Sequence, residues 1–261
     1  MATKLRDYTD KEPQFRFYME QHANQSYDFV KSKLDEYQTV QHKQMKMSRA
    51  LQLMDLFVDP SDPDVSTANS IHAYQTAERV RAEHPYDEEM QICGLIHDLG
   101  KVLFSFGEPA WAVVGDTFAV GCEFPKSIVY YEDTMHENPD YYHPIYNSKY
   151  GVYSPNCGIE NVLLSFGHDE YLYRVLQSNT NHFLSKKYQQ IIRFHSCYPW
   201  HTGNAYSHLE QPSDRELKQL VIEFNKYDLY SKQDTDFVLT REIRQYYNAL
   251  LDKFFPEPLN W

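Results

Sequence analysis

The sequence predicts an all-α fold, a helical bundle that is interrupted by one long irregular insertion. Apolar residues recur at helical spacing in most segments of the chain. Strand-like alternation is scarce, with residues 127–131 as the only candidate. Hydrophobic residues make up 42% and aromatic residues 15% of the 261-residue chain, which is enough for a large packed core and excludes a disordered protein. We therefore expect a single domain over residues 1–261.

The first part of the chain is expected to contain an irregular N-terminal arm, residues 1–10, and three helices. The predicted helices cover residues 11–37, 48–57 and 69–83. The second of these ends at residues 58–64, because a loop rich in proline and aspartate is too rigid and too polar for a helix.

Residues 88–99 are expected to form a helix that is buried on all sides. Asp87 is a typical N-cap, and the acids that follow it face the positive end of the helix dipole. Gly100 is predicted to be the glycine that ends the helix. His97 and Asp98 then lie in the last turn of a buried helix, where unpaired charge is costly. A metal ion is an economical partner for both.

The chain changes character after this helix. Residues 107–157 contain five of the 13 prolines and four of the nine glycines and are predicted to be an irregular segment. Inside a helical protein such a segment is more often a lid or a pocket wall than a linker. Helices are expected again over residues 159–177, 185–197, 213–230 and 241–255, with a kink at Gly167 and a capping box at Ser213–Glu216.

Composition excludes several classes of protein. The net charge of -12 argues against a nucleic-acid partner and against an anionic membrane. The four cysteines form no C-x-x-C pair, which argues against a zinc knuckle and a thioredoxin-like site, and reduced thiols are expected. No apolar run is long enough to span a bilayer. A cytoplasmic protein is the simplest interpretation.

Four of the twelve histidines follow apolar stretches in predicted helices, namely His72, His97, His168 and His195. The others lie among polar or turn residues and are expected to be solvated: His22, His42, His84, His136, His143, His182, His201 and His208. Taken singly, each of the four is more typical of a hydrogen-bonded core histidine than of a ligand. Together with Asp98 they form the nitrogen and oxygen donor set that borderline transition metals prefer.

Two acids complete this predicted metal site. Asp98 has two carboxylate oxygens and could bridge two ions. Asp228 lies late in a predicted helix among aromatic residues. The alternative is an ordinary surface aspartate, which is disfavoured because an acid near a helix C-terminus opposes the dipole.

The order of these residues resembles the HD-domain superfamily of metal-dependent helical proteins, with His97-Asp98 rather than His168-Asp169 as its signature. Longer motifs resemble the myo-inositol oxygenase family over about Arg6 to Trp261. They are Asp59-Pro-Ser-Asp-Pro-Asp-Val, Asn69-Ser-Ile-His-Ala, Leu95-Ile-His-Asp-Leu-Gly-Lys, Gly107-Glu-Pro-Ala-Trp-Ala-Val-Val-Gly-Asp-Thr-Phe, Trp200-His-Thr-Gly and Glu223-Phe-Asn-Lys-Tyr-Asp-Leu-Tyr.

The resemblance implies an HD-domain-like helical bundle with two iron ions, mixed-valent Fe(II)/Fe(III) in the active form. It implies one iron on His72, His97, Asp98 and Asp228, and a second iron on His168, His195 and the bridging Asp98. The implied reaction cleaves the ring of myo-inositol with O₂ to give D-glucuronate in inositol catabolism. The implied substrate contacts are Arg6, Asp59, Ser61, Lys101, Gly115, Asp116, His195, Ser196 and Lys232.

Lys101 is the implied catalytic residue, because an ammonium just beyond the metal-binding turn would favour deprotonation of a metal-bound alkoxide. The expected partners are myo-inositol and O₂, with no nucleic acid and no membrane, and we expect a monomer. Two alternatives stay open: an HD-type metal-dependent phosphohydrolase and a non-catalytic metal-binding protein. A phosphohydrolase would need a cluster of basic residues for phosphate, and the implied pocket is short of arginine.

Overall fold

The structure is a computed structural model that describes residues 12–61, 68–231 and 237–261 of the chain. Arg6 and Lys232, two of the implied substrate contacts, and the N-terminal arm lie outside the described residues.

Helices dominate the described part of the chain. The α-helices are α1 (Glu12–Asn24), α2 (Tyr27–Glu36), α3 (Met47–Leu53), α4 (Asn69–Glu83), α5 (Glu88–Ile96), α6 (Tyr131–Thr134), α7 (His168–Ser178), α8 (Lys186–Phe194), α9 (Tyr198–His201), α10 (Asp214–Ser231) and α11 (Arg241–Phe254). The 3-10 helices are η1 (Met54–Leu56), η2 (Leu99–Phe106), η3 (Ala110–Ala112), η4 (Met135–Glu137), η5 (Pro139–Tyr142) and η6 (Ile159–Asn161). Strands β1 (Gln44–Met45) and β2 (Leu259–Asn260) pair antiparallel. The predicted all-α fold is confirmed.

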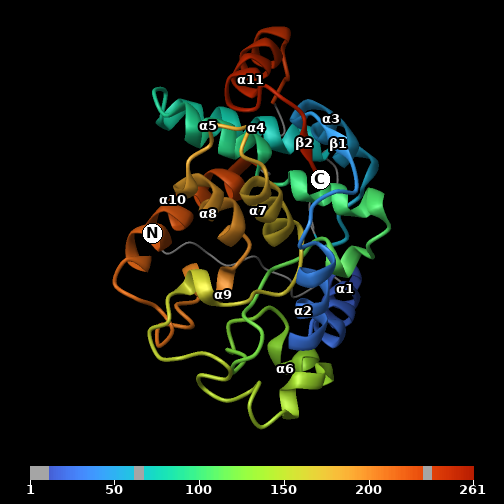
Figure 1. Ribbon diagram of the computed structural model, residues 1–261, viewed down its shortest axis with the longest axis vertical. Helices are drawn as coiled ribbons and strands as arrows, with labels where there is room; N and C mark the ends of the chain where they lie inside the picture. Colours follow the sequence, from blue (N-terminus) through green and yellow to red (C-terminus); the bar gives the residue numbers. More distant parts are fainter. Residues whose placement is uncertain (1–11, 62–67, 232–236) are drawn as a thin grey trace.

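The helices form layers along the long axis of the molecule (Figure 1). Helix α11 lies at one end, and α6 lies at the other. Helices α4 and α5 pack against each other next to α11, and α7, α8 and α10 form the layer beneath them. Helix α10 contacts both α4 and α8, while α7 contacts α8 and η2. The middle of this arrangement is therefore where side chains from several helices meet.

Three predicted elements were wrong in detail. The helix expected over residues 11–37 is two helices, because Ser26 caps α2 by accepting a hydrogen bond from the Phe29 backbone N–H at 3.2 Å. The candidate strand at 127–131 is a turn that leads into α6, and the strands lie elsewhere. The helix expected over 159–177 does not kink at Gly167 but begins there, since Gly167 has extended backbone and precedes α7.

Gly100 does not end a helix. Helix α5 stops at Ile96, and Gly100 lies inside η2. A Cβ at Gly100 would lie 2.0 Å from the backbone oxygen of His168. The residue is thus required to be small because η2 crosses the start of α7 at this point.

The insertion over residues 107–157 consists of turns and short helices, which agrees with the irregular segment predicted. Backbone hydrogen bonds attach it to the helical layer: Thr117 donates to Ser196 at 2.9 Å, and Ser165 donates to Phe118 at 2.7 Å. This attachment brings Gly115 and Asp116 to the middle of the molecule.

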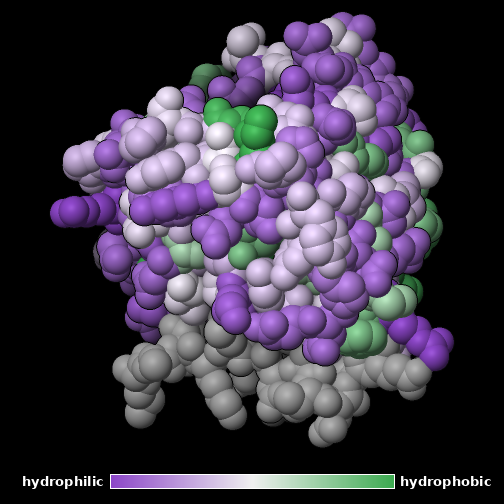
Figure 2. Space-filling view, turned by 90° about the horizontal axis from the view of Figure 1, so that it is seen from below, coloured by the Kyte–Doolittle hydropathy of each residue, from purple (hydrophilic) through white to green (hydrophobic). Residues whose placement is uncertain are grey.

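The face that includes the α6 end is mostly hydrophilic where it is coloured, with apolar residues in small separate groups (Figure 2). Within the described ranges, no helix combines the length and the apolar character that crossing a bilayer requires.

Candidate metal centre

Five separate parts of the chain bring histidine and aspartate side chains together in the middle of the bundle. The contributing positions are the first turn of α4, the junction of α5 and η2, the start of α7, the end of α8 and the last turns of α10. The side chains concerned are buried, with exposed fractions between 1% and 7%: His72, His97, Asp98, His168, Asp169, His195 and Asp228. A set of charged and polar groups this deep in a core needs strong mutual compensation.

Backbone carbonyl groups fix the orientation of three of the imidazole rings. The Nδ1 atom of His97 lies 2.8 Å from the Gly94 oxygen, that of His168 lies 2.8 Å from the Val113 oxygen, and that of His195 lies 2.7 Å from the Ile192 oxygen. Because a carbonyl accepts only, each Nδ1 must carry the proton and donate it. In a neutral ring, Nε2 is then the lone-pair atom, which is the arrangement of a histidine that binds metal.

The two carboxylate oxygens of Asp98 face different histidines. Oδ2 lies 3.6 Å from Nε2 of His97 and 4.0 Å from Nε2 of His72. Oδ1 lies 3.2 Å from Nε2 of His168 and 3.7 Å from Nε2 of His195. Asp98 therefore stands between two groups of nitrogen donors, with one oxygen toward each.

Asp228 belongs to the first group. Its Oδ1 lies 2.8 Å from Nε2 of His72 and 3.5 Å from Nε2 of His97. The donor atoms of these three residues lie close enough together to hold one ion. The surface-aspartate alternative for Asp228 is excluded, because the residue is 4% exposed.

The second group contains an acid that the sequence reasoning missed. Asp169 Oδ1 lies 2.8 Å from Nε2 of His168 and 3.7 Å from Nε2 of His195. Asp169 also accepts from the Ser196 backbone N–H at 3.2 Å. The signal in the sequence is the His168-Asp169 dipeptide, which competes with His97-Asp98 as the signature of the superfamily. Both His-Asp dipeptides in fact meet at the same site.

The charges of the site stabilise one another. Burial disfavours the charged form of Asp98, but Lys101 and His97 hold its pKa well below its usual value. Burial also disfavours the imidazolium of His168, while Asp169 and Asp98 raise its pKa to about 10. The carboxylates thus stay ionised and attract positive charge to the Nε2 atoms. A metal cation on those atoms would supply the same charge.

Lys101 lies beside the carboxylate of Asp98. Its Nζ atom is 2.9 Å from Asp98 Oδ2, 3.0 Å from Asp59 Oδ2 and 3.3 Å from Asn69 Oδ1. Asp59 Oδ1 in turn accepts from the Ser61 hydroxyl at 2.6 Å. Burial opposes the ammonium form, yet Asp98 and Asp59 raise the pKa of Lys101 above its ordinary value. Lys101 therefore remains positively charged inside the protein.

A cavity of about 30 Å³ opens among these groups, enough for about two water molecules. Of the described residues, those that line it are Asp59, Ser61, Asp98, Lys101, Gly115, Asp116, His168, His195, Ser196, Tyr198 and Asp228. All of the implied substrate contacts that fall within the described residues are among them. Tyr198 was not foreseen; its hydroxyl lies 3.3 Å from the Asn225 side-chain nitrogen.

The loop at Gly115 has a conformation that L-residues rarely adopt, with φ of 97°. A Cβ there would also lie 2.5 Å from the Gln21 side-chain nitrogen, which binds the Val114 carbonyl at 3.0 Å. Glycine is thus required to bring Asp116 to the cavity.

Two histidines expected on the surface are buried. His22 and His201 are 0% and 1% exposed. Burial lowers the pKa of His22 to about 3 and that of His201 to about 4, so both are neutral at pH 7. Their sequence neighbours are polar, but contacts from distant segments cover them, such as Thr134 on His22 at 2.7 Å.

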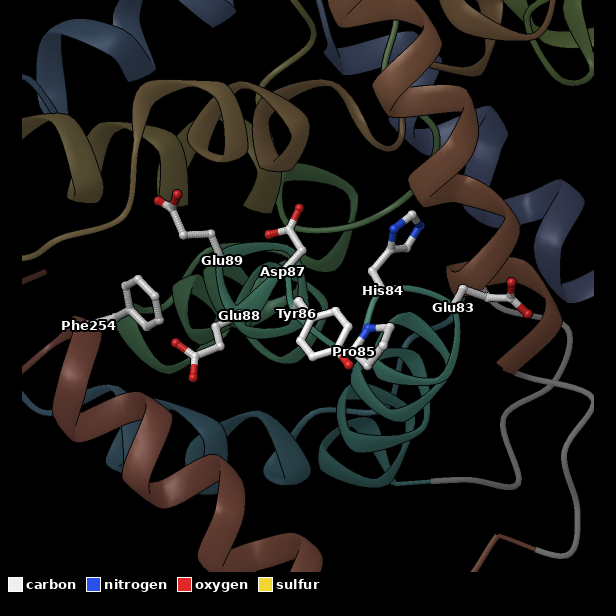
Figure 3. A pocket seen from close by; sticks show the side chains of 8 residues that line it. All are labelled: Glu83, His84, Pro85, Tyr86, Asp87, Glu88, Glu89 and Phe254. Atoms are coloured by element: carbon white, nitrogen blue, oxygen red, sulfur yellow. The ribbon is translucent and has the colours of Figure 1, made fainter.

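A second hollow on the surface, at the start of α5, is lined by many acids (Figure 3). Their carboxylates point in different directions, and those of Asp87, Glu88 and Glu89 each have a structural partner. Asp87 caps α5 at 2.9 Å and accepts from the Tyr188 hydroxyl, Glu89 accepts from the Ser185 backbone, and Glu88 pairs with Lys253. This hollow therefore has the character of a helix junction rather than of a binding site.

The donor chemistry fits a transition metal. Imidazole nitrogens with lone pairs and ionised carboxylate oxygens converge from separate helices, and backbone acceptors hold the rings. The fold and the site thus define a helical protein with a buried His/Asp metal centre.

Comparison with known proteins identifies the family to which the chain belongs. The family model described as myo-inositol oxygenase matches residues 11–261. The chain is 45% identical over 247 residues to inositol oxygenase of Danio rerio, covering 95% of this chain and 88% of that protein. It is 46% identical over 247 residues to inositol oxygenase of Homo sapiens, covering 95% and 86%. It is 45% identical over 264 residues to inositol oxygenase 1 of Arabidopsis thaliana, covering 98% and 84%. The chain belongs to the myo-inositol oxygenase family.

Proposed function

We propose that this protein is an inositol oxygenase, a di-iron enzyme that cleaves the ring of myo-inositol with O₂ to give D-glucuronate and water. Family membership supports the reaction. The observation that carries the proposal is the position of Asp98, whose two oxygens face separate groups of histidines. A carboxylate in that position can bridge two ions.

Two iron ions fit the donor groups as follows. His72, His97 and Asp228 with Asp98 Oδ2 would hold the first ion, and His168 and His195 with Asp98 Oδ1 would hold the second. A mixed-valent Fe(II)/Fe(III) pair would supply the binding site for O₂, and the electrons that reduce O₂ would come overall from the oxidised polyol. In this assignment Asp169 accepts hydrogen bonds from Ser196 and is not a ligand, so the second ion has fewer protein ligands and leaves positions for substrate oxygens.

The residues around the cavity would bind and orient the polyol. Asp59, Ser61, Asp116 and Ser196 present hydroxyl and carboxylate groups suited to the hydroxyls of a cyclitol. The present cavity holds about two waters, so a substrate must displace these side chains or exchange hydrogen bonds with them. Arg6 and Lys232 are proposed as further contacts on the resemblance alone.

Lys101 would stabilise the negative charge of a substrate oxygen when its proton leaves. Its ammonium is buried and lies 2.9 Å from Asp98 Oδ2, next to the ions in this proposal. In a site shielded from water, a fixed positive charge stabilises an alkoxide more strongly than it would in solution. Lys101 is therefore the proposed catalytic residue.

The remaining expectations form part of the same proposal. The chain would act as one domain, with residues 107–157 as a pocket wall, and as a cytoplasmic monomer. The expected partners are myo-inositol and O₂ rather than a nucleic acid or a membrane. The acidic net charge of -12 supports the exclusion of nucleic acid.

The phosphohydrolase alternative is disfavoured by the side chains around the cavity. Of the described residues that line it, Lys101 is the one with a permanent positive charge, and it is held by two carboxylates. A phosphate group would meet more carboxylates than cations there. The non-catalytic alternative does not explain why polar groups line a cavity beside the donor atoms.

The test is anaerobic loading with Fe(II), followed by addition of myo-inositol and O₂ and measurement of D-glucuronate. Production of D-glucuronate in proportion to O₂ consumed is expected. Absence of product, together with hydrolysis of nucleotides by the metal-loaded protein, would refute the assignment in favour of a phosphohydrolase.

A further inference from the structure

A buried ion pair joins helix α7, which begins at His168, to helix α8, which ends just before His195. The Nε atom of Arg193 in α8 lies 2.6 Å from Oε2 of Glu170 in α7. The two residues are 5% and 4% exposed. Each residue places an opposite charge beside the other, which offsets part of the cost of burying the pair.

Both residues lie close in sequence to His168 and His195, the histidines of the second donor group. Glu170 follows His168 by two residues, and Arg193 precedes His195 by two residues. The Nε2 atoms of the two histidines lie 3.4 Å apart. The ion pair thus spans the same two helices just behind the histidines. His72, His97 and Asp228 lie on other elements.

The guanidinium makes further contacts that a simple charge could not make. One terminal nitrogen donates to the Glu160 carbonyl at 2.7 Å, and the other donates to the Val162 carbonyl at 3.3 Å. Both carbonyls belong to the segment that leads into α7. A planar group with several donors therefore fixes α7, α8 and this segment relative to one another.

Stability alone does not explain why an ion pair occupies this buried position. Buried ion pairs are often no more stabilising than apolar residues of the same volume, because the desolvation penalty offsets the attraction. What the pair does supply is a fixed distance and direction between two helices. At this position, that distance sets the separation of two histidine ligands.

We propose that Arg193 and Glu170 are positioning residues that hold His168 and His195 at the spacing required by the second metal ion. The inference rests on the proposed function, since it assumes two ions. The first ion, on His72, His97 and Asp228, does not depend on this ion pair.

Stepwise anaerobic titration with Fe(II), with iron per chain measured at each step, tests the inference. Arg193→Met should leave the first binding step unchanged and weaken the second by about 10- to 100-fold, the usual effect of losing a residue that orients metal ligands. Arg174→Met is the matched control. Arg174 binds the same Glu170 at 2.9 Å, but its side chain is 28% exposed and makes contact from within α7 itself. Its removal should change neither step.

Arg193→Lys is a second variant in case Arg193→Met does not fold. It keeps the positive charge opposite Glu170 but loses the planar group. It too should weaken the second step selectively, and its folding is checked by circular dichroism. Equal affinities in Arg193→Lys and Arg174→Met would overturn the inference, as would parallel weakening of both steps. A wild-type chain that binds one iron would instead refute the proposed function, before any variant is compared.

Discussion

Substitution of Gly100 by alanine is the sharpest test of how the site is built. The added Cβ would lie 2.0 Å from the backbone oxygen of His168, 2.7 Å from its carbonyl carbon and 2.8 Å from its Cα. These are backbone atoms, so a rotation of a side chain cannot relieve the overlap. The His168 backbone N–H and its Nδ1 both bind the Val113 carbonyl at 2.8 Å, which holds this backbone in place. Helix η2 and the start of α7 must therefore move apart.

The cost can be estimated from overpacking of well-packed interiors, which is typically about 1–3 kcal/mol. An overlap with backbone atoms belongs at the upper end, so we expect a loss of about 3 kcal/mol in the free energy of unfolding. For a chain of this size, about 1 kcal/mol shifts the melting temperature by roughly 2–4 °C, which predicts a fall of roughly 6–12 °C.

Thermal unfolding of Gly100→Ala, with Gly167→Ala as the matched control, measures this effect. Gly167 precedes the same histidine, has an extended backbone with φ of -168°, and its added Cβ would lie 3.4 Å from the Val113 oxygen. Because alanine can adopt this extended backbone, the control should keep the stability of wild type or gain up to about 1 kcal/mol. If the two variants melted at the same temperature, the close crossing of η2 and α7 would be wrong.

Three further predictions concern individual side chains. His168→Ala and His195→Ala should each lower bound iron towards one per chain, since both serve the second ion in the proposal; two irons in both variants would contradict this division. Lys101→Met should retain its iron and lose turnover by about 10²- to 10³-fold, because it removes a charge that acts on substrate; loss of iron instead would make its role structural. His22→Asn should flatten the acid dependence of stability measured by urea unfolding. Burial lowers the pKa of His22 to about 3, so between pH 6.5 and about 3 only the unfolded chain binds this proton, and the contribution of His22 to stability falls by about 1.4 kcal/mol for each unit by which the pH is lowered. An identical slope in both proteins would exclude His22 as the source.

Local signals predicted several elements well. Helices expected over 69–83 and 241–255 are observed as Asn69–Glu83 and Arg241–Phe254. Asp87 accepts from the Met90 backbone N–H at 2.9 Å, as the predicted N-cap requires. These signals lie within a few residues of the element that they define, so a single sequence contains them.

The sequence predictions that were wrong or incomplete concern residues whose structure depends on contacts between distant segments. The continuous helix expected over 159–177 is replaced by extended chain before His168, where the Val113 carbonyl accepts from both the backbone and the ring of that residue. Asp169 was not predicted as part of the site, because it comes close to His195 and Ser196 only when α7 and α8 pack against each other. The ligand set itself came from resemblance to a family, not from spacing, and it remains a prediction for each residue.

The packing around Gly100 explains why one short stretch serves both halves of the site. Helix α5 ends at Ile96, and the chain turns into η2 at Asp98, which directs its carboxylate between two groups of histidines. Asp98 reaches His168 at 3.2 Å because η2 lies directly against the start of α7, and that approach is possible because Gly100 has no side chain. The glycine had been expected to end a helix, but its role is to set a distance between backbones. The carboxylate proposed to bridge the ions and a small residue two positions later are thus parts of one arrangement, and loss of the glycine should move the carboxylate away from His168.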